Sequence, residues 1–202
     1  AGDRAREGAE ASQADSWGRR VLRLGQALGL ESVAGHWLSL MDRRLCHLKS
    51  LVRSRFVCTP FVVVGVDGNG YRVFGSRHPG LGDLLYISAG FTPCTEVRGM
   101  QLAHTDSLAG VAGFGCRAAL FLVHGPDRPG LAVEWEEAVR RVDARQEDAR
   151  GSAAEGAGAV RGDPRCLVVG WSGTDDAAAY ERLVEDLTLL LLEPALAMGT
   201  LG

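Results

Sequence analysis

Residues 59 to 74 read TPFVVVGVDGNGYRVF, and this stretch decides the fold. Pro60 ends the helical pattern before it, and residues 61–66 are too rich in β-branched side chains for anything but a strand. Asp67-Gly68-Asn69-Gly70 is a strong turn signal, and residues 71–74 can form a second short strand. The stretch therefore predicts strand, tight turn and strand after a helical region.

Two helices are predicted upstream of this stretch. A polar tail occupies residues 1–14, and a first helix then carries apolar residues at helical spacing until Gly29 ends it. A second helix runs from about Glu31 to Phe56. The two apolar stripes consist of Trp17, Val21, Leu24 and Leu28 in the first helix, and of Val33, Trp37, Met41, Leu45, Leu48 and Val52 in the second.

The chain after residue 74 mixes short helices and strands. Pro79-Gly80 can start a short helix that Gly90 would end, and strands are expected at 97–102 and 118–123. Helix is expected at 133–142, followed by a low-complexity linker at 144–164.

A strand at 165–171 and a helix capped by Asp175 or Asp176 complete the pattern. The buried side of this last helix is predicted to hold Tyr180, Leu183, Val184, Leu187 and Leu191. The whole pattern predicts an α+β protein, with one domain over 15–112 and a β-α-β-α extension over 113–202.

Charge gives little guidance to a partner. A net charge of −3 over 202 residues offers no whole-chain attraction for nucleic acid or anionic lipid. The first part of the chain is nevertheless rich in arginine, and a basic helical face there could contact a protein partner. The candidate partner-binding residues are Arg19, Arg20, Arg23, Arg43 and Arg44.

The five cysteines are irregularly spaced, and none form a CxxC pair. An odd, scattered set is typical of reduced, buried thiols, which predicts an intracellular protein of the cytoplasm or an organelle interior. The five histidines show no metal-ligand spacing, so no metal and no cofactor is expected. No apolar run is long enough to span a bilayer.

One enzymatic pattern appears and is incomplete. Residues 121–125 (FLVHG) and 168–173 (VVGWSG) resemble the oxyanion-hole strand and the nucleophile turn of α/β-hydrolases. Thr174 occupies the position where the motif needs glycine, and no histidine follows His124, although that fold places its histidine after the serine. A degenerate serine hydrolase centred on Ser172 is therefore only a third hypothesis, and no catalytic residue is assigned.

A family resemblance covers residues from about 45 to 108. Thr59-Pro60 ends a helix, an aromatic-led strand and Asn69 follow, and Ala89-Gly90-Phe91 closes a short helix. This order resembles a PUB domain, the helical module of peptide N-glycanase and certain ubiquitin-pathway adaptors. The sequence departs from the family where its strand opens with Phe61-Val62 in place of Tyr-Arg.

The resemblance implies a noncatalytic interaction module that binds a peptide tail, with candidate contacts at Phe61, Asn69, Tyr71 and Arg72. An accessory structural subunit of a large assembly, such as an organellar complex, is the alternative, motivated by the arginine-rich start and the apolar segment 189–201. A profilin-like or longin-type α+β sheet is the alternative fold. A hairpin at Asn69 would favour that sheet, and a helix starting there would favour the PUB domain.

Overall fold

The computed structural model describes residues 17–68, 70–125, 128–150, 164–174 and 176–192. Two helices come first, α2 (Trp17–Ala27) and α3 (Glu31–Arg55), and they are followed by β1 (Pro60–Asp67) and β2 (Gly70–Phe74). A π-helix η1 (Asp83–Ser88), the short strands β3 (Thr92–Pro93) and β4 (Leu102–Thr105), and α4 (Leu108–Ala112) come next. The chain continues with β5 (Ala118–Val123), α5 (Leu131–Arg150), β6 (Arg165–Gly170) and α6 (Ala177–Leu192).

The strands form one mixed six-stranded sheet in the order β4-β2-β1-β5-β6, with β3 beside the start of β1. β1, β5 and β6 are parallel, whereas β2 is antiparallel to β1 and β4 is antiparallel to β2. All six residues of β5 are buried, because both faces of a central parallel strand are covered. The carboxyl ends of β1, β5 and β6 consequently meet at one edge.

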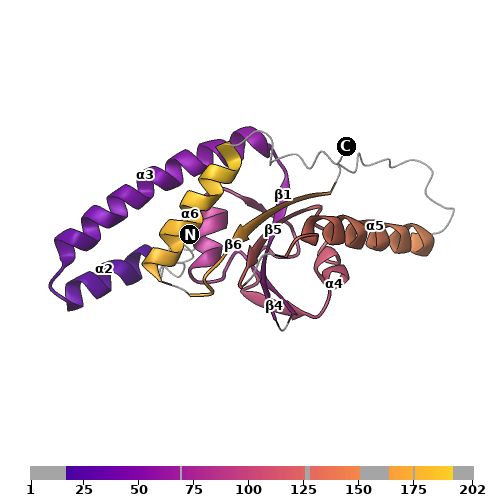
Figure 1. The fold of residues 1–202 in the computed structure, drawn as a ribbon, viewed down its shortest axis with the longest axis horizontal. Helices are drawn as coiled ribbons and strands as arrows, with labels where there is room; N and C mark the ends of the chain where they lie inside the picture. The colour runs from indigo at the N-terminus through magenta and orange to yellow at the C-terminus, as the bar shows by residue number, and fades with distance from the viewer. Residues whose placement is uncertain (1–16, 69, 126–127, 151–163, 175, 193–202) are drawn as a thin grey trace, which may run out of the picture.

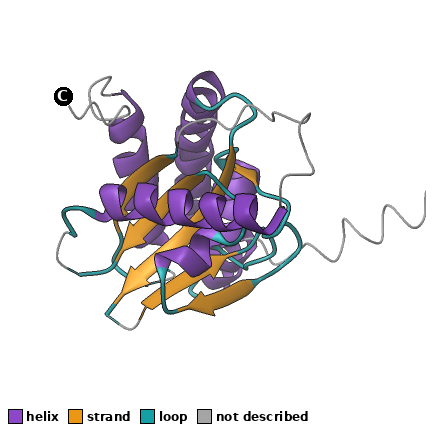
Figure 2. Cartoon of the chain, turned by 90° about the vertical axis from the view of Figure 1, so that its right-hand side faces the viewer, coloured by secondary structure: helices purple, strands orange, loops and turns teal. Residues whose placement is uncertain are grey.

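Helices cover both faces of this sheet (Figures 1 and 2). α3, α6 and η1 lie on one side, and α4 and α5 lie on the other. On the second side, the fully buried Trp135 of α5 packs edge-on against Phe121 and donates from Nε1 to the carbonyl of Arg165. These layers define an α/β fold, which corrects the predicted α+β class.

The α2–α3 hairpin extends beyond the rest of the molecule (Figure 1). The predicted stripe of α3 is buried only from Met41 onward, at Met41, Leu45, Leu48 and Val52. Leu24 and Leu28 of the first predicted stripe are exposed, as is Val33 of the second. The helical pattern was right, but the buried side was wrong for the part of the hairpin outside the sheet layers.

Residues 59–74 form the two expected strands. β1 and β2 pair as a hairpin in which Asp67 faces Gly70, so no helix starts after the turn. Asn69 itself lies outside the described residues. The strand predicted at 97–102 was wrong, because residues 97–99 lie in a turn and the strand starts only at Leu102.

The β-α-β-α order predicted for the final third is confirmed, and the structure shows which aspartate caps its last helix. Asp176 Oδ1 accepts from the N–H of Ala179 at 2.8 Å, so Asp176 is the helix cap. All five residues predicted for the inner side of α6 are buried. α5 continues to Arg150, so residues 144–150 of the predicted linker are helical, and residues 151–163 lie outside the description.

Two cysteines contradict the expectation of reduced thiols. Cys94 and Cys116 form a disulfide, while Cys46, Cys58 and Cys166 are free. The bridge joins residues beside the start of β1, since Cys94 N–H donates to the Phe61 carbonyl and Phe61 pairs with Ala118 of β5. Spacing along the chain carried no sign of this contact, because the sheet creates it.

Candidate functional site

Polar side chains gather at the carboxyl edge of the sheet. β1 ends at Asp67, and the antiparallel pairing of β2 and β4 brings Arg72 opposite His104 and Tyr71 opposite Thr105 at the same edge. Together with Gly70 and Asp106 they line a hollow of about 350 Å³, called here the carboxyl-edge hollow. In open α/β sheets, ligands bind outside the carboxyl ends of the parallel strands.

The charges of the hollow are mixed. Arg72 Nε lies 3.2 Å from Asp67 Oδ2, and both side chains are partly exposed. His104 and Asp106 add an imidazole and a second carboxylate to the rim. Such a set offers donors and acceptors to a polar ligand rather than a strong field of one sign.

The loops after β5 and β6 continue this edge. His124 follows β5 and its N–H donates to Val66, while Trp171 follows β6 and its N–H donates to Val123. His124 Nδ1 lies 3.2 Å from the Trp171 carbonyl oxygen, which can only accept. Nδ1 therefore carries a proton and donates it to this oxygen.

Gly173 is required at this point for two reasons. Its φ of +78° is a conformation that L side chains rarely adopt, and a Cβ there would lie 2.9 Å from His124 Nδ1. The segments HG and WSG, which the hydrolase pattern singled out, thus do lie together in space. Ser172 Oγ, however, bonds to Thr174 Oγ1 at 2.9 Å, and the His124 Nδ1 proton is used by Trp171.

The start of α6 is held by its cap. A hydrogen bond from Thr174, with a second from the backbone N–H of Ala179, holds the pKa of Asp176 below its usual value. Asp176 thus stays charged while it fixes the helix start beside Ser172 and Gly173. Tyr180 on the next turn stacks on Trp171 with ring centroids 5.9 Å apart.

The predicted contact residues are distributed over different parts of the fold. Tyr71 and Arg72 line the carboxyl-edge hollow, whereas Phe61 is buried in the core against Phe56 and Phe91. His104 and Asp106 also line the hollow but are not among the contact residues predicted from the sequence. The pairing of β2 with β4 places His104 opposite Arg72 and brings Asp106, just after β4, to the same edge, and no local signal reveals that pairing.

The candidate partner-binding arginines lie on the helices α2 and α3. Arg44 pairs with Glu181 of α6, which also accepts from Trp37 Nε1 at 3.1 Å, so Arg44 joins two helices of the same chain. Arg20 lies near Asp83, the first residue of η1. Burial raises the pKa of Asp83 above its usual value, and the charge of Arg20 opposes part of that rise. Arg19 and Arg23 are exposed on α2, and Arg43 donates to the Ser39 carbonyl within α3.

Two kinds of feature are absent from the described residues. No group of three or more histidine, cysteine, aspartate or glutamate side chains in that part of the chain could hold a metal ion. None of the described helices combines the length and apolar character that crossing a bilayer requires.

Comparison with known proteins identifies the fold. No family model matches the chain, and no curated protein matches its sequence. Solved structures do match. FhuD2 from Staphylococcus aureus with bound ferrioxamine B has a TM-score of 0.60 at 11% identity, covering 88% of this chain and 64% of that one. At this identity the likeness is one of fold alone.

Two further structures agree. The FhuD protein from S. pseudintermedius matches with a TM-score of 0.63 at 11% identity, over 92% of this chain and 61% of its own. FeuA from Bacillus subtilis, complexed with ferri-bacillibactin, matches with a TM-score of 0.56 at 15% identity, over 87% and 59%. This chain therefore spans about three fifths of the length of the structures it matches.

These matches correct the PUB resemblance and the adaptor function attached to it. The resemblance rested on residues 45–108 as an independent helical unit, yet β1 pairs with β5 and lies at the centre of a sheet that extends to β6. The glycines, prolines and apolar residues that matched the PUB pattern are common to any helix-strand-helix segment. The matched structures belong to proteins that bind small ligands.

Proposed function

We propose that this chain is a ligand-binding lobe that takes a small siderophore-type iron complex against the carboxyl edge of its sheet. The observation that carries the proposal is the fold match to ligand-bound FhuD2 and FeuA over most of the chain. The carboxyl-edge hollow lies where ligands of α/β folds bind, and it offers Arg72 and His104 as polar contacts.

A location outside the reducing cytosol is part of this proposal. Disulfides persist in oxidising compartments, and the Cys94–Cys116 bridge fits such a setting better than the cytoplasm predicted from the cysteine count. A matched protein from B. subtilis is described as a periplasmic binding component of a ferrichrome transporter. The noncatalytic character of this chain follows the same proposal, since its role would be to hold a ligand.

A second α/β lobe would complete the site. The matched proteins are longer than this chain, and the α2–α3 hairpin extends from the sheet with exposed leucines at its tip. We place the second lobe against this tip, where it would cover apolar side chains that otherwise face water. Binding by the single lobe is then expected to be weaker than binding by a two-lobed protein.

The test is a fluorescence titration with ferrioxamine B and with ferri-bacillibactin. Trp171 follows β6 at the carboxyl edge, so a coloured iron complex bound there should quench tryptophan emission in a saturable way. Arg72→Ala and His104→Ala should each weaken the quenching. Arg140→Ala is the matched control, because Arg140 is exposed on α5 and pairs only within its own helix.

The outcomes separate clearly. Saturable quenching that Arg72→Ala and His104→Ala reduce, and Arg140→Ala leaves unchanged, supports the proposal. Absence of saturable quenching by either complex at millimolar concentration would refute it. Quenching that all three variants retain would place the ligand elsewhere on the lobe.

A further inference from the structure

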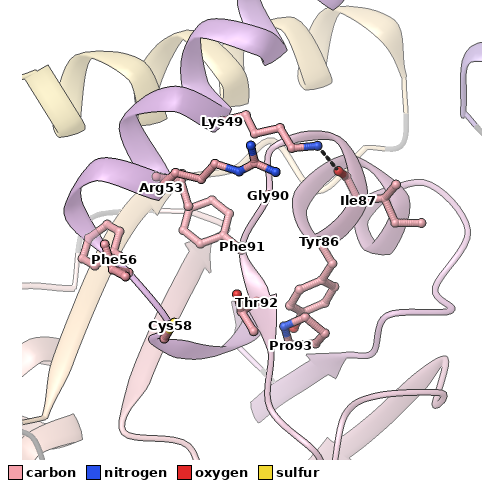
Figure 3. A pocket seen from close by; sticks show the side chains of 12 residues that line it. Lys49, Arg53, Phe56, Cys58, Tyr86, Ile87, Gly90, Phe91, Thr92 and Pro93 are labelled. Atoms are coloured by element: carbon pink, nitrogen blue, oxygen red, sulfur yellow. Dashed lines mark hydrogen bonds between the residues drawn. The ribbon is translucent and has the colours of Figure 1, made fainter.

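A second cavity lies at the opposite, amino edge of the sheet. It has a volume of about 490 Å³, is open to solvent, and is bordered by the last turns of α3, the loop leading into β1, η1 and the segment that enters β3. This amino-edge cavity is within the size range of small-molecule sites. Figure 3 shows its side chains, which come from segments separated in the sequence but brought together by the pairing of β3 with β1.

Two cations of α3 line this cavity. Lys49 and Arg53 are four residues apart, so they project from the same face of the helix. Among the residues that the structure describes, no aspartate or glutamate lines the cavity. Lys49 Nζ donates to the Ile87 carbonyl at 3.3 Å, as Figure 3 shows, and this contact leaves its charge uncompensated.

Like charges at this spacing repel each other. Within the described residues, the ion pairs of the chain involve other arginines, and neither Lys49 nor Arg53 has a carboxylate partner. A bound anion would relieve the repulsion, and the fork of an arginine accommodates a carboxylate through two parallel hydrogen bonds.

The floor of the cavity is aromatic. Phe56 and Phe91 are buried and pack edge-on against Phe61 between them, each with ring centroids 5.0 Å from it. In Figure 3 the ring of Phe91 lies next to the side chain of Arg53. Because both rings are almost fully buried, the apolar surface that a ligand can reach comes from Val57 and Ile87, which line the cavity and are 72% and 48% exposed.

Gly90 keeps the cavity wall close to Lys49. Its φ is +81°, and a Cβ there would lie 2.8 Å from Lys49 Cγ. The glycine therefore lets the backbone between η1 and β3 pass under the lysine stem, which holds the ammonium group toward the Ile87 carbonyl. The position of this cation is thus fixed by the fold rather than left to a free surface side chain.

We propose that the amino-edge cavity binds a small aromatic carboxylate. Its carboxylate would pair with Arg53 and Lys49, and its ring would pack against the exposed side chains of Val57 and Ile87. A bare inorganic anion would leave these two apolar side chains facing water, and an uncharged ring would leave both cations unpaired. This site is separate from the carboxyl-edge hollow and does not depend on the function proposed for it.

Benzoate is the probe, and Cys58 supplies a built-in reporter. Cys58 lines the cavity and its thiol is free and exposed, while Cys46 is free and exposed on α3 outside the cavity. Alkylation with the neutral reagent iodoacetamide, read by mass spectrometry of the two peptides, measures both rates in one sample. At ten times its Kd, benzoate should slow Cys58 about tenfold and leave Cys46 unchanged.

Variants and calorimetry complete the test. Lys49→Gln with Arg53→Gln should abolish the protection and the heat of benzoate binding, whereas Arg55→Gln, which removes a cation from the same helix end outside the cavity, should preserve both. The circular-dichroism melting curve of each variant shows whether it folds. No protection of Cys58 by millimolar benzoate would overturn the proposal, and so would equal protection by inorganic phosphate or by benzamide.

Discussion

Cys166 shows how strongly a single position in the sheet can change side-chain chemistry. Burial in β6 raises the pKa of its thiol to about 11, and the nearby charge of Glu136 acts in the same direction. Only the thiolate reacts with alkylating reagents, and at pH 8 its fraction should be roughly a hundredfold below that of an ordinary cysteine. Cys46 and Cys58 should therefore be alkylated first, as peptide mass spectrometry can measure. Equal rates for all three thiols would contradict the burial of Cys166.

Residues whose roles depend on near neighbours could be predicted from sequence. The cap at Asp176 and the buried side of α6 follow from contacts one to four positions apart, and both are confirmed. The contact of Gly173 with His124 joins two loops at adjacent strand ends, and the sequence of neither loop predicts this contact. The carboxyl-edge hollow is of this second kind, which is why only scattered members of it could be predicted.

At the scale of elements, two glycines show that the effect of a glycine-to-alanine change on stability depends on what packs against the element. A Cβ at Gly75 would lie 2.2 Å from the carbonyl oxygen of Met100, so Gly75→Ala must displace backbone and should cost about 1–3 kcal/mol of unfolding free energy. Gly35 in α3 has no atom within 4 Å of such a Cβ. Gly35→Ala should therefore stabilise the protein by about 0.5–1 kcal/mol. Urea denaturation of both variants measures the difference, and destabilisation by Gly35→Ala would contradict the open surroundings of this helix position.

The same contrast explains which elements could be predicted. The turn signal at 67–70 between two predicted strands indicated a tight turn, and the pairing of β1 with β2 confirms it. Gly75 also lies against the segment before β4, because its N–H donates to the carbonyl of Gln101. This contact joins segments that are distant in sequence. The disulfide has the same origin, since the start of β1 brings Cys94 and Cys116 together. Local propensity identifies elements, and pairing determines what they touch.

For the whole molecule, the order of the elements could be predicted from the sequence, but their arrangement in space could not. Alternating strand and helix in the final third correctly predicted β5, α5, β6 and α6. The α/β class, however, depends on β1 lying parallel to β5, a pairing of Phe61 with Ala118 that crosses η1, β4 and α4. A division into an N-terminal helical domain and a separate extension cut the sheet at this pairing. The apparent PUB unit and the apparent extension share one hydrophobic core.

The tip of the α2–α3 hairpin gives the last prediction, which rests on the proposed second lobe. Residues 24–41 contain one charged side chain, Glu31, and Leu24, Leu28 and Val33 are each more than 60% exposed. Without its covering lobe, such a surface should drive self-association that increases with protein concentration. Leu24→Glu with Leu28→Glu should shift sedimentation toward the monomer, because the new charges must stay hydrated.

Leu189→Glu, at a similarly exposed position on α6, should leave the association unchanged. A protein that sediments as a monomer at every concentration would instead mean that the tip tolerates water, and the placement of a second lobe against it would lose its physical basis.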